Sequence, residues 1–154
     1  MSTITGTVEA IFIVPSGGAA MQIVDQVCAL ADCGLEGDRY CRRTGYWTGV
    51  DECQVTLIEG EGLDEIEQTT GVRVAHGEHR RNIVTRGIRL SDLVGKEFQV
   101  GEAIFAYDRP RPPCHYIETL TQPGMTRALV RRGGICATVV RGGLIRSGDT
   151  IDAL

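Results

Sequence analysis

The stretch GGICATVVRGG, residues 133–143, places a run rich in β-branched residues between two pairs of glycines. β-Branched side chains favour strands, and glycines favour the turns at which strands end. The same pattern recurs along the chain, because 20 glycines separate short runs that are rich in Val, Ile, Thr and Phe. This pattern favours many short strands over long helices.

Outward from this stretch, which predicts a strand over residues 135–141, the sequence predicts further short elements. The other expected strands lie at residues 3–14, 23–31, 54–58, 82–85, 97–100, 103–107 and 150–153. Helical segments are expected at residues 61–70, 90–94 and 125–131, and Gly71 should end the first of them.

Two segments interrupt this pattern. Residues 34–39 predict a tight loop, and three prolines within residues 109–113 predict a rigid break, because proline fixes φ and lacks a backbone donor. Strands and helices do not alternate as they do in βαβ folds. We therefore expect a mainly β protein with a closed or nearly closed β-barrel and a few short helices, since closure removes exposed strand edges.

The size and composition indicate one water-soluble domain covering residues 1–154. A chain of 154 residues can bury a substantial core on its own. No apolar run approaches the roughly 18 residues of a membrane span. The first residues, Met1 to Val14, lack the basic and apolar regions of a signal peptide. We expect a cytoplasmic protein with no membrane partner.

The charge distribution argues against one class of partner and leaves another open. A formal net charge of −4 does not suit a nucleic-acid-binding protein, which needs a surplus of Lys and Arg. Arginines nevertheless form local groups along the chain. Each group either binds a carboxylate or phosphate or is a set of solvated surface charges. The groups are Arg39/Arg42/Arg43, Arg80/Arg81, Arg109/Arg111 and Arg131/Arg132.

Six cysteines are present, and with no secretion signal we expect all of them to be thiols. Cys28 and Cys136 lie in apolar runs and are expected in the core. Cys33, Cys41 and Cys53 lack the close pairing of a structural zinc site. His76 and His79 are expected in a solvated loop.

Cys114 has a different context, because it lies in the run RPRPPCH, residues 109–115. The prolines stiffen the chain, and Arg109, Arg111 and His115 bring positive charge that favours the thiolate. A thiolate can carry sulfur as a persulfide or bind a soft metal. The alternative is an ordinary buried cysteine.

Three other motifs are modest when taken singly. Residues 34–40, GLEGDRY, form either a simple glycine turn or a loop that presents Asp38 and Arg39 to a site. Arg80-Arg81-Asn82 offers donors for a phosphate or the edge of a heterocycle. Arg132-Gly133-Gly134 offers backbone N–H groups to an anion.

Taken in order, these motifs resemble the MOSC domain, named for the C-terminal part of molybdenum-cofactor sulfurases. The resemblance rests on GLEGDR (34–39), RRNI (80–83), GK to GE (95–102), PC (113–114), and the pairs Gly133-Gly134 and Gly148-Asp149. It implies a barrel like the β-barrel domain of pyruvate kinase. It also implies that Cys114 handles sulfur or ligates molybdenum, and that Arg80 and Asn82 bind the pterin of the molybdenum cofactor (molybdopterin).

The sequence departs from this family in two respects. Tyr40 stands where many stand-alone relatives carry histidine, which puts a metal-ligand or base role at that position in doubt. The 154 residues also hold neither a cysteine-desulfurase domain nor the N-terminal partner domain of molybdenum-dependent amidoxime reductases. We therefore expect activated sulfur to come from a separate sulfur donor.

The leading hypothesis is a module that binds the molybdenum cofactor or carries sulfur on Cys114, with a sulfur donor or a molybdoenzyme as partner. Arg80 and Asn82 would hold the pterin, aided by Arg39 and Arg109. One alternative is a molybdenum-dependent reductase of N-hydroxylated compounds that works with separate electron-donor proteins. Bound molybdenum together with reduction of an N-hydroxylated compound would distinguish it. The other is a non-catalytic interaction domain, for which Cys114→Ala should leave function intact.

Overall fold

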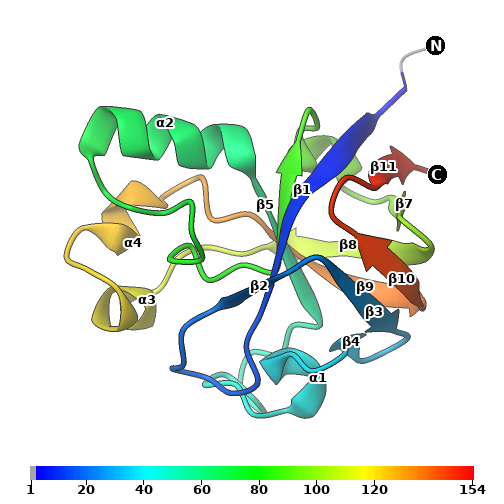
Figure 1. The fold of residues 1–154 in the computed structure, drawn as a ribbon, viewed down its shortest axis with the longest axis horizontal. Helices are drawn as coiled ribbons and strands as arrows, with labels where there is room; N and C mark the ends of the chain where they lie inside the picture. The colour runs from blue at the N-terminus through cyan, green and yellow to red at the C-terminus, as the bar shows by residue number, and fades with distance from the viewer. Residues whose placement is uncertain (1–2) are drawn as a thin grey trace.

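Seven strands close into a barrel in the computed structural model, which describes residues 3–154 (Figure 1). The strands follow the order β1, β11, β7, β8, β9, β5, β6 and back to β1, and only β5 and β6 pair in parallel. Their bounds are β1 Thr5–Ile13, β5 Val55–Glu59, β6 Ile83–Arg86, β7 Glu97–Val100, β8 Ala103–Pro110, β9 Ile135–Arg141 and β11 Thr150–Ala153. The expectation of a closed, mainly β barrel is confirmed.

Four further strands lie beside the barrel. β2 (Gln22–Val24) pairs with the end of β1, while β3 (Gln26–Leu30), β4 (Gly34–Leu35) and β10 (Gly143–Arg146) form a small second sheet. The expected single strand over residues 23–31 is therefore wrong. It divides at Asp25, because β2 pairs with β1 whereas β3 pairs with β10.

The helices are short and flank the barrel. They are α1 (Arg39–Arg42), α2 (Gly60–Thr70), α3 (His115–Leu120), α4 (Met125–Ala128) and the 3₁₀ turn η1 (Leu90–Leu93). α2 connects the two parallel strands, which no tight turn can join. It ends where Gly71 takes a left-handed φ of 73°, as the sequence predicts. Between residues 3 and 154, no helix has the length and apolar character needed to span a bilayer.

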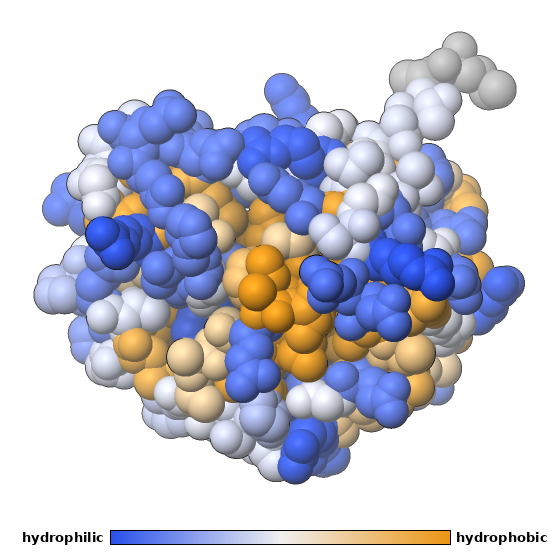
Figure 2. All heavy atoms as spheres, in the orientation of Figure 1, coloured by the Kyte–Doolittle hydropathy of each residue, from blue (hydrophilic) through white to orange (hydrophobic). Residues whose placement is uncertain are grey.

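Two apolar cores hold the molecule together. The larger fills the barrel and includes the edge-to-face pair Phe98 and Phe105, whose ring centroids are 5.8 Å apart. The smaller joins the outside of β5 and β6 to α2, α3 and α4. Figure 2 shows a mainly hydrophilic face with an apolar patch near its centre, over the region of β2, whose Ile23 is largely exposed. The second core fixes α3, and with it the residues just before α3, against the barrel.

The loops that the sequence predicts at residues 34–39 and 109–113 are more ordered than expected. The first holds β4 and the start of α1, where both carboxylate oxygens of Asp38 accept backbone N–H groups, from Val14 and Tyr40. In the second, β8 continues through Pro110 because the N–H of Arg111 donates to Gly134 O at 2.8 Å. A proline at the strand end therefore costs no ladder hydrogen bond.

The cysteines differ from the expectation in two places. Cys33 and Cys41 form a disulfide, with Cα atoms 4.6 Å apart, because β4 and the turn into α1 fold these positions onto each other. Cys28 is exposed, since the alternation of β3 directs Val27 and Ala29 inward instead. Cys136 is buried, as predicted.

Candidate functional site

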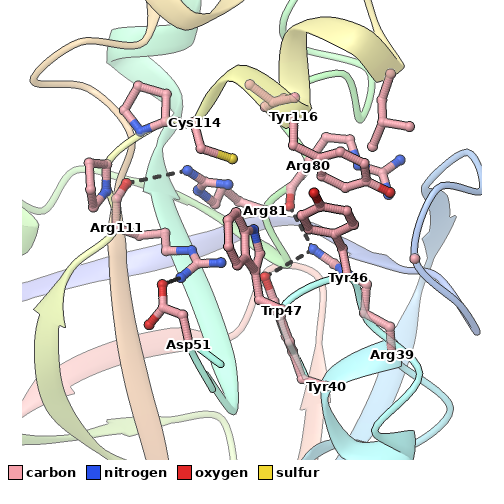
Figure 3. A pocket seen from close by; sticks show the side chains of 15 residues that line it. Arg39, Tyr40, Tyr46, Trp47, Asp51, Arg80, Arg81, Arg111, Cys114 and Tyr116 are labelled. Carbon is pink, nitrogen blue, oxygen red and sulfur yellow. Dashed lines mark hydrogen bonds and ion pairs between the residues drawn. The ribbon is translucent and has the colours of Figure 1, made fainter. Parts of the chain in front are cut away.

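A cavity of about 220 Å³ lies between the α1 region and the segment that leads into α3 (Figure 3). We call it the arginine cavity because four arginines line it: Arg39, Arg80, Arg81 and Arg111. Its other lining residues are Gly17, Tyr40, Tyr46, Trp47, Asp51, Pro112, Pro113, Cys114, Tyr116, Ile117 and Leu120. All four arginines are buried, none being more than 8% exposed.

Two of these arginines have carboxylate partners. Arg39 lies 3.2 Å from the buried carboxylate of Asp38, and it also donates to the backbone oxygen of Arg80 at 3.0 Å. Arg111 pairs with Asp51 at 2.9 Å. These contacts fix both guanidinium groups at the cavity wall.

Arg80 and Arg81 have no such partner within residues 3–154. They donate to backbone carbonyls instead: Arg80 to Ala19 O, and Arg81 to Gly133 O at 2.6 Å and Arg111 O at 3.3 Å. Burial lowers the pKa of both guanidinium groups. Burying a cation without a counter-charge costs free energy, and an anionic ligand in this cavity would offset that cost.

The backbone conformation of Arg80 also indicates a ligand-binding site. Its φ is 62°, a left-handed conformation that is uncommon for a residue with a side chain. The N–H of Arg80 donates to Gly77 O at 3.0 Å, which holds this turn. Residues kept in such conformations cluster at ligand-binding and active sites.

Cys114 directly precedes α3, at its N-terminal end, and its sulfur faces the arginine cavity (Figure 3). Its backbone is extended and its carbonyl accepts from Ile117 N at 3.1 Å and from Thr126 Oγ1 at 3.3 Å. The preceding turn packs so closely on Gly133 that a Cβ there would lie 2.3 Å from Arg111 O. The position of the sulfur is thus set from both sides.

Aromatic rings form one side of the cavity. Tyr46 and Tyr116 stack with centroids 3.8 Å apart and an angle of 15° between planes, and Trp47 meets Tyr46 edge to face. The ring of Tyr40 lies 4.2 Å from the Arg39 guanidinium carbon, and its hydroxyl accepts from Arg39 Nη2 at 3.1 Å. Flat aromatic surfaces of this kind suit a planar ring in a ligand.

The structure brings three of the predicted site residues together: Cys114, Arg80 and Arg39 all line the arginine cavity. Asn82 lies behind it, fully buried. Its side-chain amide donates to Phe12 O at 3.1 Å and accepts from Thr56 N at 3.0 Å. Arg109 also lies outside the lining, where it pairs with Asp51 and Asp108. Asp51 connects Arg109 to the cavity, because it also binds Arg111.

Sequence reasoning missed the aromatic wall and the burial of Arg81 and Arg111. One signal was available: Tyr46 adjoins the single tryptophan of a chain that is only 5% aromatic. The stacking partner, Tyr116, is 70 residues away, and no local pattern indicates it.

His79 is not the solvated loop residue that we expected. It is fully buried, and its Nδ1 accepts the N–H of Arg81 at 2.9 Å. Burial and the charges of Arg81 and Arg80 lower its pKa to about 3, so it is neutral. His76 is exposed, as predicted. No three His, Cys, Asp or Glu side chains of residues 3–154 gather into a metal site.

The sequence profile of the MOSC domain matches residues 44–152, more than two thirds of the chain. The chain belongs to the MOSC domain family. This family is associated with the molybdenum cofactor, and the matched residues include most of the arginine cavity and Cys114. By sequence, no curated protein matches this MOSC domain.

Solved structures share the fold of this MOSC domain at low sequence identity. The YuaD protein of Bacillus subtilis is 19% identical with a TM-score of 0.77, covering 99% of this chain and 97% of that one. YiiM of Geobacillus stearothermophilus is 17% identical with a TM-score of 0.71, covering 97% and 75%. YiiM of Escherichia coli is 18% identical with a TM-score of 0.63, covering 100% and 70%. At these identities the likeness establishes the fold alone.

Proposed function

We propose that this MOSC domain binds a molybdopterin-type cofactor in the arginine cavity. The Cys114 thiolate either carries activated sulfur or ligates the metal. One observation carries the proposal. Arg80 and Arg81, two buried arginines that have no carboxylate partner in the part of the chain that the structure describes, line the same cavity as a half-buried cysteine. That combination suits an anionic ligand that exchanges sulfur with a cysteine or is ligated by its thiolate.

The donor set fits each part of such a cofactor. Guanidinium groups bind phosphate with strong, charge-assisted hydrogen bonds. The stacked pair Tyr46 and Tyr116 offers a flat surface to a pterin ring. A thiolate is a preferred ligand of soft metals. When bound, the molybdenum cofactor supplies redox and atom-transfer chemistry at its metal.

The residues of the chain have distinct tasks in this proposal. Arg80 and Arg81 neutralise the anion, and Arg39 and Arg111, fixed by Asp38 and Asp51, complete the positive wall. The Tyr40 hydroxyl holds Arg39 in place.

Cys114 receives sulfur from the persulfide of a separate donor protein. Its thiolate attacks the terminal sulfur of the donor persulfide, R–S–SH. The donor S–S bond breaks, a new S–S bond forms at Cys114, and the donor leaves as R–S⁻. No electrons are gained or lost overall, so this step requires no further reactant.

The test is retention of molybdenum cofactor by the purified protein. Cofactor released from a molybdoenzyme is mixed with the protein, and the bound pterin is measured by fluorescence after gel filtration. Wild type should retain pterin, and Arg80→Gln should weaken binding by about tenfold or more, since a hydrogen bond to a charged group contributes about 1.5–3 kcal/mol. Arg132→Gln is the matched control, because Arg132 pairs with Glu65 at the surface.

The role of Cys114 has its own readout. After incubation with a protein persulfide, intact-mass spectrometry should show one added sulfur on wild type and none on Cys114→Ser. If wild type neither retains pterin nor accepts sulfur, the proposed function is wrong. Full function in Cys114→Ala would favour a non-catalytic interaction domain.

A further inference from the structure

The Cys33–Cys41 disulfide closes a loop that carries part of the arginine cavity. Residues 34–40 lie between the two cysteines, and two of them, Arg39 and Tyr40, line the cavity (Figure 3). Cys41 follows Tyr40 directly and belongs to the same helix, α1. The covalent bond at Cys41 therefore adjoins two residues of the cavity wall.

The elements of this loop are too short to be stable by themselves. β4 consists of two residues, Gly34–Leu35, and α1 consists of four, Arg39–Arg42. A helix of a single turn is unfavourable in isolation, because fixing its dihedral angles costs more free energy than its few hydrogen bonds contribute. The conformation of the loop is therefore set by the contacts that hold its ends.

Hydrogen bonds hold α1 on one side, and the disulfide holds it on the other. The N–H of Val14 donates to Asp38 Oδ1 at 3.0 Å, and the N–H of Arg39 donates to Val14 O at 2.7 Å. The disulfide joins Cys41, within α1, to Cys33, the residue just before β4. Reduction breaks the covalent link and leaves the hydrogen bonds, so the loop should loosen without unfolding.

A reductant has access to this disulfide. Both cysteines are partly exposed, and both line a second cavity, of about 240 Å³, which we call the disulfide cavity. Tyr40 lines it too, so one side chain borders the disulfide cavity and the arginine cavity. Disulfides within reach of solvent are the ones that are readily reduced and that serve regulation.

We propose that the Cys33–Cys41 disulfide is a redox switch that controls ligand binding in the arginine cavity and is reduced by an external dithiol. The inference rests on the proposed function, since it concerns the ligand of that cavity. In the oxidised protein the closed loop holds Arg39 and Tyr40 in the wall. In the reduced protein the loop has more conformations, and a ligand that contacts Arg39 has to order them on binding. Reduction therefore weakens binding.

The dithiol supplies both electrons of the reduction. One of its thiolates attacks a sulfur of the Cys33–Cys41 bond, which breaks as a mixed disulfide forms and one cysteine leaves as a thiolate. The second thiol of the reductant then attacks the reductant sulfur of the mixed disulfide and displaces the other cysteine. Two electrons and two protons pass to Cys33 and Cys41, and the reductant leaves as a cyclic disulfide.

Cofactor binding by wild type in its two redox states tests the switch. Oxidised protein and protein reduced with dithiothreitol are each titrated with released molybdenum cofactor, and the thiols are located by alkylation and peptide mapping. We expect reduction to raise the Kd about fivefold or more, the lower end of ordinary coupling between two sites. Because such coupling is reciprocal, saturating cofactor should raise the ratio of oxidised to reduced protein by the same factor in a dithiothreitol buffer of fixed composition.

Two variants control this measurement. The double variant Cys33→Ser/Cys41→Ser should bind like the reduced protein and show no response to dithiothreitol, so it also reports any effect of the reductant on the cofactor itself. Cys28→Ser removes an exposed free thiol of β3 and should respond like wild type. Equal Kd values in the two redox states would overturn the proposal, as would alkylation of Cys33 and Cys41 in protein that has not been reduced.

A measurement without ligand separates this inference from the proposed function. Reduction of wild type should speed amide hydrogen exchange at residues 38–42 and leave exchange in β9 unchanged. If neither redox state retains pterin, the proposed function is wrong, and hydrogen exchange alone then decides on the switch. Faster exchange at residues 38–42 supports a loop that responds to reduction, and unchanged exchange overturns it.

Discussion

Residues 79–81 concentrate buried nitrogen atoms with little negative charge nearby. His79 accepts the N–H of Arg81 through Nδ1, so its proton is on Nε2, which finds no hydrogen-bond partner within residues 3–154. Its ring packs edge to face on Phe12, with centroids 5.0 Å apart. A neutral histidine here spares the region a further positive charge beside two arginines. The turn that presents Arg80 and Arg81 to the cavity therefore depends on His79 staying uncharged.

The pH dependence of stability should report this directly. The pKa of His79 is about 3 in the folded protein and about 6.5 when unfolded, so below pH 6.5 only the unfolded chain gains the proton. Its contribution should lower the free energy of unfolding by up to about 1.4 kcal/mol for each pH unit between pH 6.5 and 3. Urea titrations of wild type and His79→Gln should show a shallower acid slope in the variant. His76→Gln, at an exposed histidine, should retain the wild-type slope.

The buried carboxylate of Asp38 should contribute strongly to stability. It caps the start of α1, accepts Val14 N–H and pairs with Arg39, so Asp38→Asn leaves a buried guanidinium without its counter-charge. We expect a loss of about 3–5 kcal/mol in the free energy of unfolding. Urea denaturation measures it. The comparison is Glu52→Gln, which breaks the exposed pair with Arg43 and should cost less than about 1 kcal/mol. Equal losses in the two variants would contradict the role given to Asp38.

The elements that carry the cavity are held together by close backbone contacts. The turn from β8 into α3 lies on Gly133, just before β9, with Arg111 O and Pro113 in contact. A side chain at residue 133 would push this turn outward and move Cys114 with it. Glycine is required here by space and not by a turn conformation.

Gly133→Ala should therefore destabilise the fold and disturb the site together. We expect a loss of about 1–3 kcal/mol in the free energy of unfolding, the usual cost of overpacking, and weaker retention of pterin. Gly62→Ala is the matched control: it lies in α2, and its added Cβ would meet only Arg132, at 3.9 Å. There alanine should stabilise the protein by about 0.5–1 kcal/mol. Thermal denaturation should show a lower melting temperature for Gly133→Ala and a higher one for Gly62→Ala, and pterin binding should weaken only in Gly133→Ala.

The sequence predicts elements whose signals are local and misses those fixed by distant partners. The strands at residues 97–100, 135–141 and 150–153 match β7, β9 and β11 to the residue, because each is a short segment bounded by glycines or by the chain end. β10 and α3 were not predicted: their stability comes from pairing with β3 and from packing against α4. The Cys33–Cys41 bond was missed for a different reason: its partners are only eight residues apart, but without a secretion signal all six cysteines were expected to be thiols. At the site, Cys114 and Arg80 were found from motifs, whereas Tyr116 joins Tyr46 only through the fold.

At the scale of the whole molecule, the site depends on barrel closure. β11 is the only strand that joins β1 to β7 among the described residues, through pairs such as Gly6 with Ile151 and Ile151 with Val100. Closure fixes β1, and β1 in turn pairs with β6, which begins two residues after Arg81. The arginine cavity is thus connected to the C-terminal strand through β1.

Deletion of residues 150–154 should accordingly abolish the fold and not merely fray one edge. It removes Ile151, fully buried in the barrel core, and leaves β1 and β7 with unpaired edges. Loss of that side chain alone costs about 2–5 kcal/mol, a large part of the 5–15 kcal/mol that stabilises a typical domain, before any strand pairing is counted. Circular dichroism and urea titration should show an unfolded or molten chain that retains no pterin. Deletion of Leu154 alone, an exposed residue, should preserve both signals. A folded, pterin-retaining protein without β11 would show that the cavity is held by α3, α4 and their own core, and that closure contributes little to it.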